Sequence, residues 1–66
     1  MRLTDKRIVK ALLSSKGIRY PEMPEDLFIM AHPGDGKLIV IKGTDFLCEF
    51  KPYVWALAQD NWYIMK

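Results

Sequence analysis

The sequence is poor in the residues that cross-link small proteins or catalyse reactions. Its 66 residues include one cysteine, Cys48, and one histidine, His32. A lone cysteine cannot form a disulfide within the chain, and a structural zinc ion needs four cysteine or histidine ligands. Nucleophilic catalysis needs a paired nucleophile and base, but His32 lies in a turn-forming segment and Cys48 lies in an apolar strand pattern. We therefore expect a non-enzymatic protein that uses no metal and no cofactor.

Long hydrophobic runs are also missing. No segment approaches the roughly 20 consecutive apolar residues of a membrane-spanning helix. Lys10 interrupts the short apolar stretch that begins at Ile8, so no signal-peptide core is expected. Together with an unpaired cysteine, this predicts no membrane contact and a reducing, cytoplasmic location.

Apolar and aromatic side chains are plentiful by contrast. Half of the residues are hydrophobic and 12% are aromatic. A chain of this length hides only about 60% of the surface that its unfolded form exposes. We expect one small domain over residues 1–66. Because it has no covalent cross-link, we also expect self-association at micromolar concentrations.

Two β-branched and apolar runs, 27–31 and 37–42, flank a segment with one proline and two glycines, and this pattern predicts a β-hairpin. A second turn at 43–44 leads into residues 45–51. There the alternation of Phe46, Cys48 and Phe50 predicts a strand with these three side chains on a core face.

An amphipathic helix is predicted over residues 4–16. Thr4 is a suitable N-cap, and Gly17 suits the left-handed position after the helix end. Two prolines within residues 21–26 predict a stiff connector without helix. The sequence therefore predicts an α+β fold, with one N-terminal helix packed on a mostly antiparallel sheet of three to five short strands over about 27–66. The helix is expected to bury Ile8, Val9, Leu12 and Leu13.

Residues 53–66 are compatible with two structures. A helix would place Trp55 and Trp62 on one side, whereas two strands would flank a turn near Asp60. The β-forming triplets Tyr-Val-Trp and Trp-Tyr-Ile favour two strands, 53–57 and 62–66.

The surplus of aromatic residues carries the main functional prediction. One helix covers one face of a sheet, so the other face must meet water, a second copy or a partner. Tryptophan and tyrosine are enriched at protein interfaces because they bury much area at small entropic cost. We expect a protein-binding module that acts as an adaptor or inhibitor of a larger protein. Its candidate interface on an aromatic-rich sheet face comprises Tyr53, Trp55, Trp62 and Tyr63.

Uneven charge supports an alternative function. Residues 1–20 carry a net charge of +5 and residues 21–66 carry −3, which together give the +2 of the chain. A basic helix can follow a phosphate backbone, so nucleic-acid binding is the alternative. No helix-turn-helix or other nucleic-acid-binding signature accompanies this basic segment. The candidate contacts are Arg2, Lys6, Arg7 and Lys10.

Overall fold

The computed structural model describes residues 1–65, so the predicted end of the last strand at Lys66 lies outside the described residues. The chain forms an α+β fold with an N-terminal helix, a short second helix and a five-stranded antiparallel sheet, as predicted. Its elements are α1 (Lys6–Leu13), β1 (Ile18–Arg19), β2 (Leu27–Ala31), β3 (Leu38–Lys42), β4 (Asp45–Glu49), α2 (Val54–Ala58) and β5 (Tyr63–Ile64).

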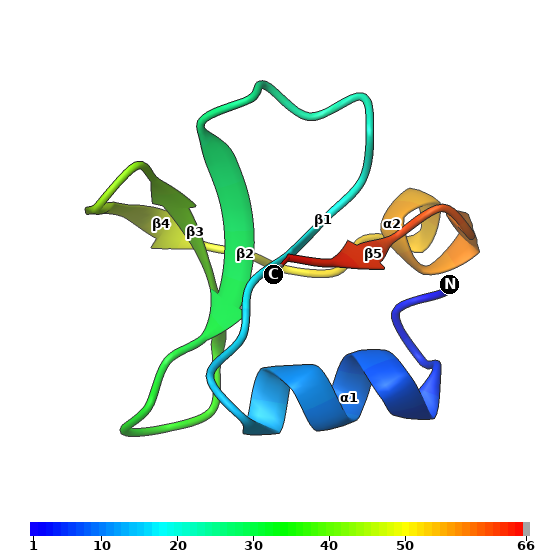
Figure 1. The fold of residues 1–66 in the computed structure, drawn as a ribbon, viewed down its shortest axis with the longest axis horizontal. Helices are drawn as coiled ribbons and strands as arrows, with labels where there is room; N and C mark the ends of the chain where they lie inside the picture. The colour runs from blue at the N-terminus through cyan, green and yellow to red at the C-terminus, as the bar shows by residue number, and fades with distance from the viewer. Residues whose placement is uncertain (66) are drawn as a thin grey trace.

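The sheet has the strand order β4-β3-β2-β1-β5, and every neighbouring pair is antiparallel. Figure 1 shows β3 and β4 to the left of β2, whereas both helices lie to its right. The sheet begins earlier than predicted, because β1 precedes the proline-containing connector. The connector, 21–26, contains no helix or strand.

The predicted β2–β3 hairpin is confirmed. Five residue pairs join its strands, with Ile29 opposite Val40 at the centre. The turn closes where the backbone N–H of His32 donates to the carbonyl oxygen of Lys37 over 2.7 Å. Gly36 has φ 74° and Gly43 has φ 63°, so both turns use the left-handed freedom of glycine.

Helix α1 is shorter than predicted at both ends. Asp5, not Thr4, is the N-cap, and its carboxylate accepts a hydrogen bond from the backbone N–H of Arg7 over 2.8 Å. At the other end Ser15, not Gly17, adopts the left-handed conformation with φ 60°. The backbone N–H groups of Ser15 and Lys16 then bond back to the last turn of the helix, which satisfies carbonyls that would otherwise lack partners.

The core lies between the sheet and α1, which packs against β1, β2 and β5. Its largest fully buried side chains are Ile8, Ile18, Ile29 and Trp62. The predicted helix stripe was too wide. Ile8 and Ala11 are buried, whereas Val9 and Leu13 are 44% and 82% exposed, because a helix directs residues i, i+3 and i+4 to one side.

Residues 54–58 form a helix, so the prediction of a strand at 53–57 was wrong. Ala56 is fully buried in the core. Its small side chain lets the α2 backbone lie against the neighbouring core side chains. The indole N–H of Trp62 donates to the Ala56 carbonyl over 3.1 Å, at the helix end where carbonyls have no helical partner. The second predicted strand is confirmed in part, as β5.

The prediction that Phe46 and Cys48 lie on a core face was also wrong. Every residue of β4 is exposed on this edge strand, which neither helix contacts. Only Phe50, which follows the strand, packs against the core. The register shifts between Val40 and Ile41, where β4 has one extra residue, Leu47, and this bulge breaks the alternation that the prediction assumed.

Candidate protein-binding surfaces

The four predicted interface residues do not form one surface. Trp62 is only 1% exposed and lies at the centre of the core. It is unavailable to a partner, and this part of the prediction was wrong. Its burial follows from tertiary structure, since the α2 carbonyl gives its indole N–H an acceptor.

Tyr53 and Trp55 are exposed, but on α2 and not on a sheet face. The exposed fractions are 64% for Tyr53, 82% for Val54, 50% for Trp55 and 42% for Leu57. We call these four residues the α2 surface. Large apolar side chains that are exposed in a cluster mark interaction sites more often than single scattered ones do.

The α2 surface stands on a rigid aromatic support. The ring of Tyr20 packs edge-on against two tryptophans, with ring centroids 6.0 Å apart for Trp55 and 4.9 Å apart for Trp62. The ring centroids of Phe50 and Trp62 are 6.2 Å apart. Edge-to-face pairs at these separations are favourable. The loop after α2 is held as well, because the Asn61 amide donates to the Glu22 carboxylate over 3.1 Å.

A second apolar surface lies on the side of the sheet that faces away from α1. Side chains alternate along strands, so residues next to the buried Ile18 and Ile29 and the partly buried Val40 point to this other side. None of the described helices covers it. We call it the open sheet face, and Tyr63 belongs to it through its pairing with Arg19. Its other large apolar members are the exposed Phe46, the partly buried Phe28, Met30 and Met65, and the buried Ile39 and Ile41.

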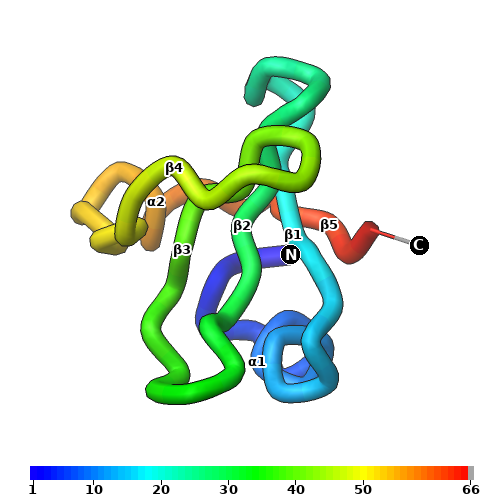
Figure 2. Tube along the Cα trace, turned by 90° about the vertical axis from the view of Figure 1, so that its left-hand side faces the viewer, coloured from blue at the N-terminus to red at the C-terminus, as the bar shows by residue number. Residues whose placement is uncertain are grey.

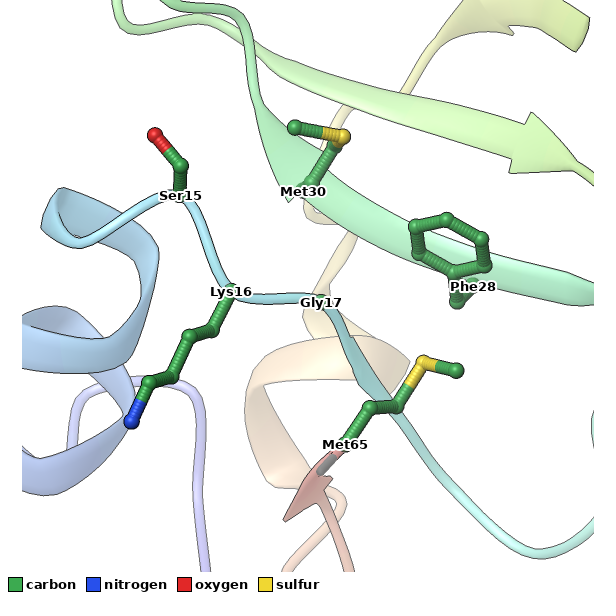
Figure 3. Close-up of a pocket in the computed structure, with 6 residues that line it drawn as sticks. All are labelled: Ser15, Lys16, Gly17, Phe28, Met30 and Met65. Carbon is green, nitrogen blue, oxygen red and sulfur yellow. The ribbon is translucent and has the colours of Figure 1, made fainter. Parts of the chain in front are cut away.

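The open sheet face has a gap at Gly17. Figure 3 shows Gly17 between Met30, Phe28 and Met65, and a shallow pocket of about 400 Å³ lies among these side chains. A Cβ at Gly17 would come within 2.7 Å of the Phe28 ring. Glycine is therefore required here for close approach, and not as the helix-capping residue that the sequence indicated.

Both edges of the sheet are unsuited to pairing with a further strand. The pairing of β4 is interrupted by a bulge, and the strand begins and ends with acidic residues, Asp45 and Glu49. At the opposite edge, β5 has only two residues. Bulges, charges and short length are the devices by which proteins protect sheet edges. Contacts with another molecule are therefore favoured on the faces of the sheet. Figure 2 shows the path of the strands β3, β2, β1 and β5 across the sheet.

The predicted basic contacts lie near and on the outer side of α1, where Arg2, Lys6 and Lys10 are exposed. Arg7 is exposed too, but its guanidinium group binds the Asp5 carboxylate at 3.0 and 3.1 Å. The hydrogen bonds from Arg7 lower the pKa of Asp5 to about 2. The charge of Arg7 is thus already compensated within the protein.

The remaining candidates for chemistry are not assembled into a site. Cys48 lies in exposed β4, and His32 lies in the hairpin turn, 3.5 Å from the carboxylate of Asp35. Among residues 1–65, no group of three or more potential ligands is placed to hold a metal ion. In the same part of the chain, neither helix has the length and apolar character of a membrane span.

No protein-family model, curated protein or solved structure matches this chain.

Proposed function

We propose that the protein is a non-enzymatic binding module that inserts α2 into an apolar groove on a larger protein, as an adaptor or inhibitor. The observation that supports this most is the α2 surface itself, where four large apolar side chains are 42–82% exposed. Tryptophan and tyrosine are among the residues that contribute most binding energy at interfaces.

The arrangement of the α2 surface indicates the kind of partner. Val54 and Leu57 are spaced i, i+3, which is how a helix presents anchors to a groove, and Tyr53 precedes them as the N-cap residue. No charged residue occurs from Tyr53 to Gln59. An uncharged apolar groove therefore complements this surface, whereas a charged cleft would lose hydration without compensation. The unpaired thiol of Cys48 supports a reducing, cytoplasmic setting for the interaction.

A photo-crosslinking amino acid at Val54 tests the proposal in a lysate of the native host. We expect one protein to be captured with or without nuclease, and to bind the module again when both are purified. Val54→Lys should then weaken the reconstituted binding at least about tenfold, because a lysine cannot enter an apolar groove without losing hydration.

Leu13 provides a matched control, since it is 82% exposed, as Val54 is, but lies on α1. Leu13→Lys should leave the reconstituted binding unchanged. Equal losses in the two variants, or a capture that nuclease abolishes, would contradict the proposal. The second of these outcomes would support the nucleic-acid alternative.

The nucleic-acid alternative has less support than the α2 surface. Arg7 is paired with Asp5, and the exposed apolar side chains of Val9 and Leu13 lie on the same short helix as Lys6 and Lys10. Phosphate binding favours a continuous basic surface.

A further inference from the structure

A basic pocket lies between α1 and the β5 edge of the sheet. It has a volume of about 220 Å³, and it is lined by Arg7, Lys10, Ala11, Ser14, Lys16 and Ile64. The first four of these residues follow one side of α1 to its C-cap residue, because residues three and four apart along a helix are neighbours on its surface. Three of the six lining residues are basic and none is acidic. The buried Ala11 and the partly buried Ile64 add an apolar wall.

Two of the positive charges in this pocket are not compensated by a described carboxylate. Neither Lys10 nor Lys16 forms a salt bridge with another of residues 1–65. Figure 3 shows the Lys16 side chain turned back toward α1. The guanidinium group of Arg7, by contrast, is held by the Asp5 carboxylate. The pocket therefore offers a ligand the charge of two lysines.

Two uncharged hydrogen-bond donors lie beside these lysines. Ser14 contributes a hydroxyl group. The other donor is the backbone N–H of Ile64, whose direction follows from the register of the sheet. The backbone N–H of Met65 donates to the Gly17 carbonyl over 2.9 Å, and bonded and non-bonded positions alternate along an antiparallel strand. The N–H of Ile64 therefore points away from β1, toward the free edge of the sheet.

The negative end of the α1 dipole is largely compensated at this place. The C-terminal end of a helix carries partial negative charge on carbonyl groups that lack partners. In α1, the carbonyl oxygens of the last turn accept hydrogen bonds from the backbone N–H groups of Ser14, Ser15 and Lys16. Lys10 also lies in that turn, so the local charge is positive.

We propose that this pocket binds a small phosphate monoester. Such a group carries a charge of about −1.5 to −2 at pH 7, which two lysines balance. A carboxylate fits less well, because it is bound best by a free arginine in a two-point contact, and Arg7 already binds Asp5 in this way. The pocket is smaller than the roughly 300–1,000 Å³ of sites for drug-sized ligands. The ligand is therefore a phosphate group with a small apolar group that lies against Ala11 and Ile64.

A single phosphate group has different requirements from a nucleic-acid backbone. The backbone is bound by many cations along a continuous surface, whereas one phosphate group needs only donors that converge on one pocket. The pocket is therefore a separate proposal from the nucleic-acid alternative. It is also independent of the α2 proposal, because no residue of the α2 surface lines the pocket.

Nitrogen-15 NMR titrations of the full chain with phenyl phosphate, inorganic phosphate and benzoate test the proposal. Because the lysines are exposed, we expect phenyl phosphate to bind weakly, with a dissociation constant on the order of 1 mM. Titration to about 20 mM at low ionic strength approaches saturation. The amide signals of Ser14, Lys16 and Ile64 should shift most. Phenyl phosphate should bind at least about threefold more tightly than inorganic phosphate, which has no apolar group, and than benzoate, which has a single charge.

Lys16→Gln is the disrupting variant, and Lys6→Gln is its matched control. Both changes remove one exposed charge, but only Lys16 lines the pocket. Lys16→Gln should weaken the binding of phenyl phosphate at least about fivefold, whereas Lys6→Gln should weaken it less than about twofold. Both variants should keep the amide signal dispersion of the folded protein, since the two side chains are exposed.

Equal losses in the two variants would indicate a general attraction to the basic segment and would overturn the proposal. Shifts that spread along α1 without saturating would also overturn it, as would benzoate that binds as tightly as phenyl phosphate. A phosphoserine peptide provides a further comparison. If it bound more tightly than phenyl phosphate, the phosphate group would belong to a phosphorylated protein, and the assignment to a small ligand would be overturned. The α2 proposal fails with Val54→Lys instead, and none of these titrations depends on it.

Discussion

The two faces of the sheet are similar in composition, but their apolar side chains are buried to different extents. On the covered face, Ile18 and Ile29 are 0% and 1% exposed beneath α1. On the open sheet face, Phe46 and Tyr63 are 60% and 42% exposed, whereas Ile39 and Ile41 at its centre are 8% and 9% exposed. The same strands supply both faces, so apolar composition alone does not decide which face becomes the core. The position of α1 decides it.

The extent of α1 explains why one face is satisfied and the other is not. The helix has eight residues, which at 1.5 Å per residue span about 12 Å. It contacts β1, β2 and β5 but not β3 or β4. Helix α1 is therefore long enough to cover only about half of one face of the sheet. The second face of the sheet has no helix packed on it among the described residues.

The largest difference between the regions is expected for the two tryptophans. Trp62→Ala should lower the free energy of unfolding by about 3–5 kcal/mol, since it removes a fully buried side chain. Trp55→Ala should cost about 1 kcal/mol or less, because Trp55 is half exposed. Chemical denaturation measures both. Comparable losses would show that α2 belongs to the core and not to a binding surface.

Isoleucines on the two faces give the next comparison. Ile29→Ala should cost about 2–5 kcal/mol, near the upper end, because Ile29 is enclosed by the core on all sides. Ile41→Ala should cost near the lower end of that range, since neighbours on the open sheet face can move into the space. Chemical denaturation of both variants makes the test. A more costly Ile41→Ala would place the core on the other face.

The sequence predicted those features that depend on neighbours along the chain. Gly36 and Gly43 marked the hairpin turns, and Ile8 marked the buried side of α1. The features it missed depend on contacts distant in sequence. Tyr53 and Trp55 have β-forming side chains, but residues 54–58 are helical because Ala56 fits against the core and supplies an acceptor to Trp62.

The candidate surface was predictable only in part, for the same reason. Exposure of Tyr53 and Trp55 follows from the helical structure of α2, which the β propensity of the segment concealed. Gly17 was interpreted as a helix cap because the chain ends a helix just before it. Its requirement for glycine arises from the Phe28 ring on a neighbouring strand, which no local pattern reveals.

Acid should weaken the packing of α1 on the covered face of the sheet before it affects the open sheet face. The pKa of Asp5 in the folded protein is lowered to about 2 from its usual 3.8, chiefly by hydrogen bonds from Arg7. A carboxyl group whose pKa is lower in the folded than in the unfolded state stabilises the folded state at pH values above its unfolded-state pKa. That stabilisation is lost as the pH falls through the folded-state pKa. The melting temperature should therefore fall between about pH 4 and pH 2. Asp5→Asn should reduce that fall, and an unchanged profile would contradict this role of Asp5.

The smallest effect is expected on the outer side of α1, which covers the sheet with its inner side only. Changing Lys6, Arg7 and Lys10 together to glutamine should leave the fold intact, because these side chains are exposed. If they bound nucleic acid, affinity would fall steeply with salt, and the change would flatten the salt dependence by roughly one unit per lost phosphate contact. We expect little binding to DNA or RNA near physiological salt and no strong effect of the change. Fluorescence anisotropy with labelled oligonucleotides over a salt series measures both. Submicromolar, salt-sensitive binding that the change abolishes would favour nucleic-acid binding through α1 over the proposed binding through α2.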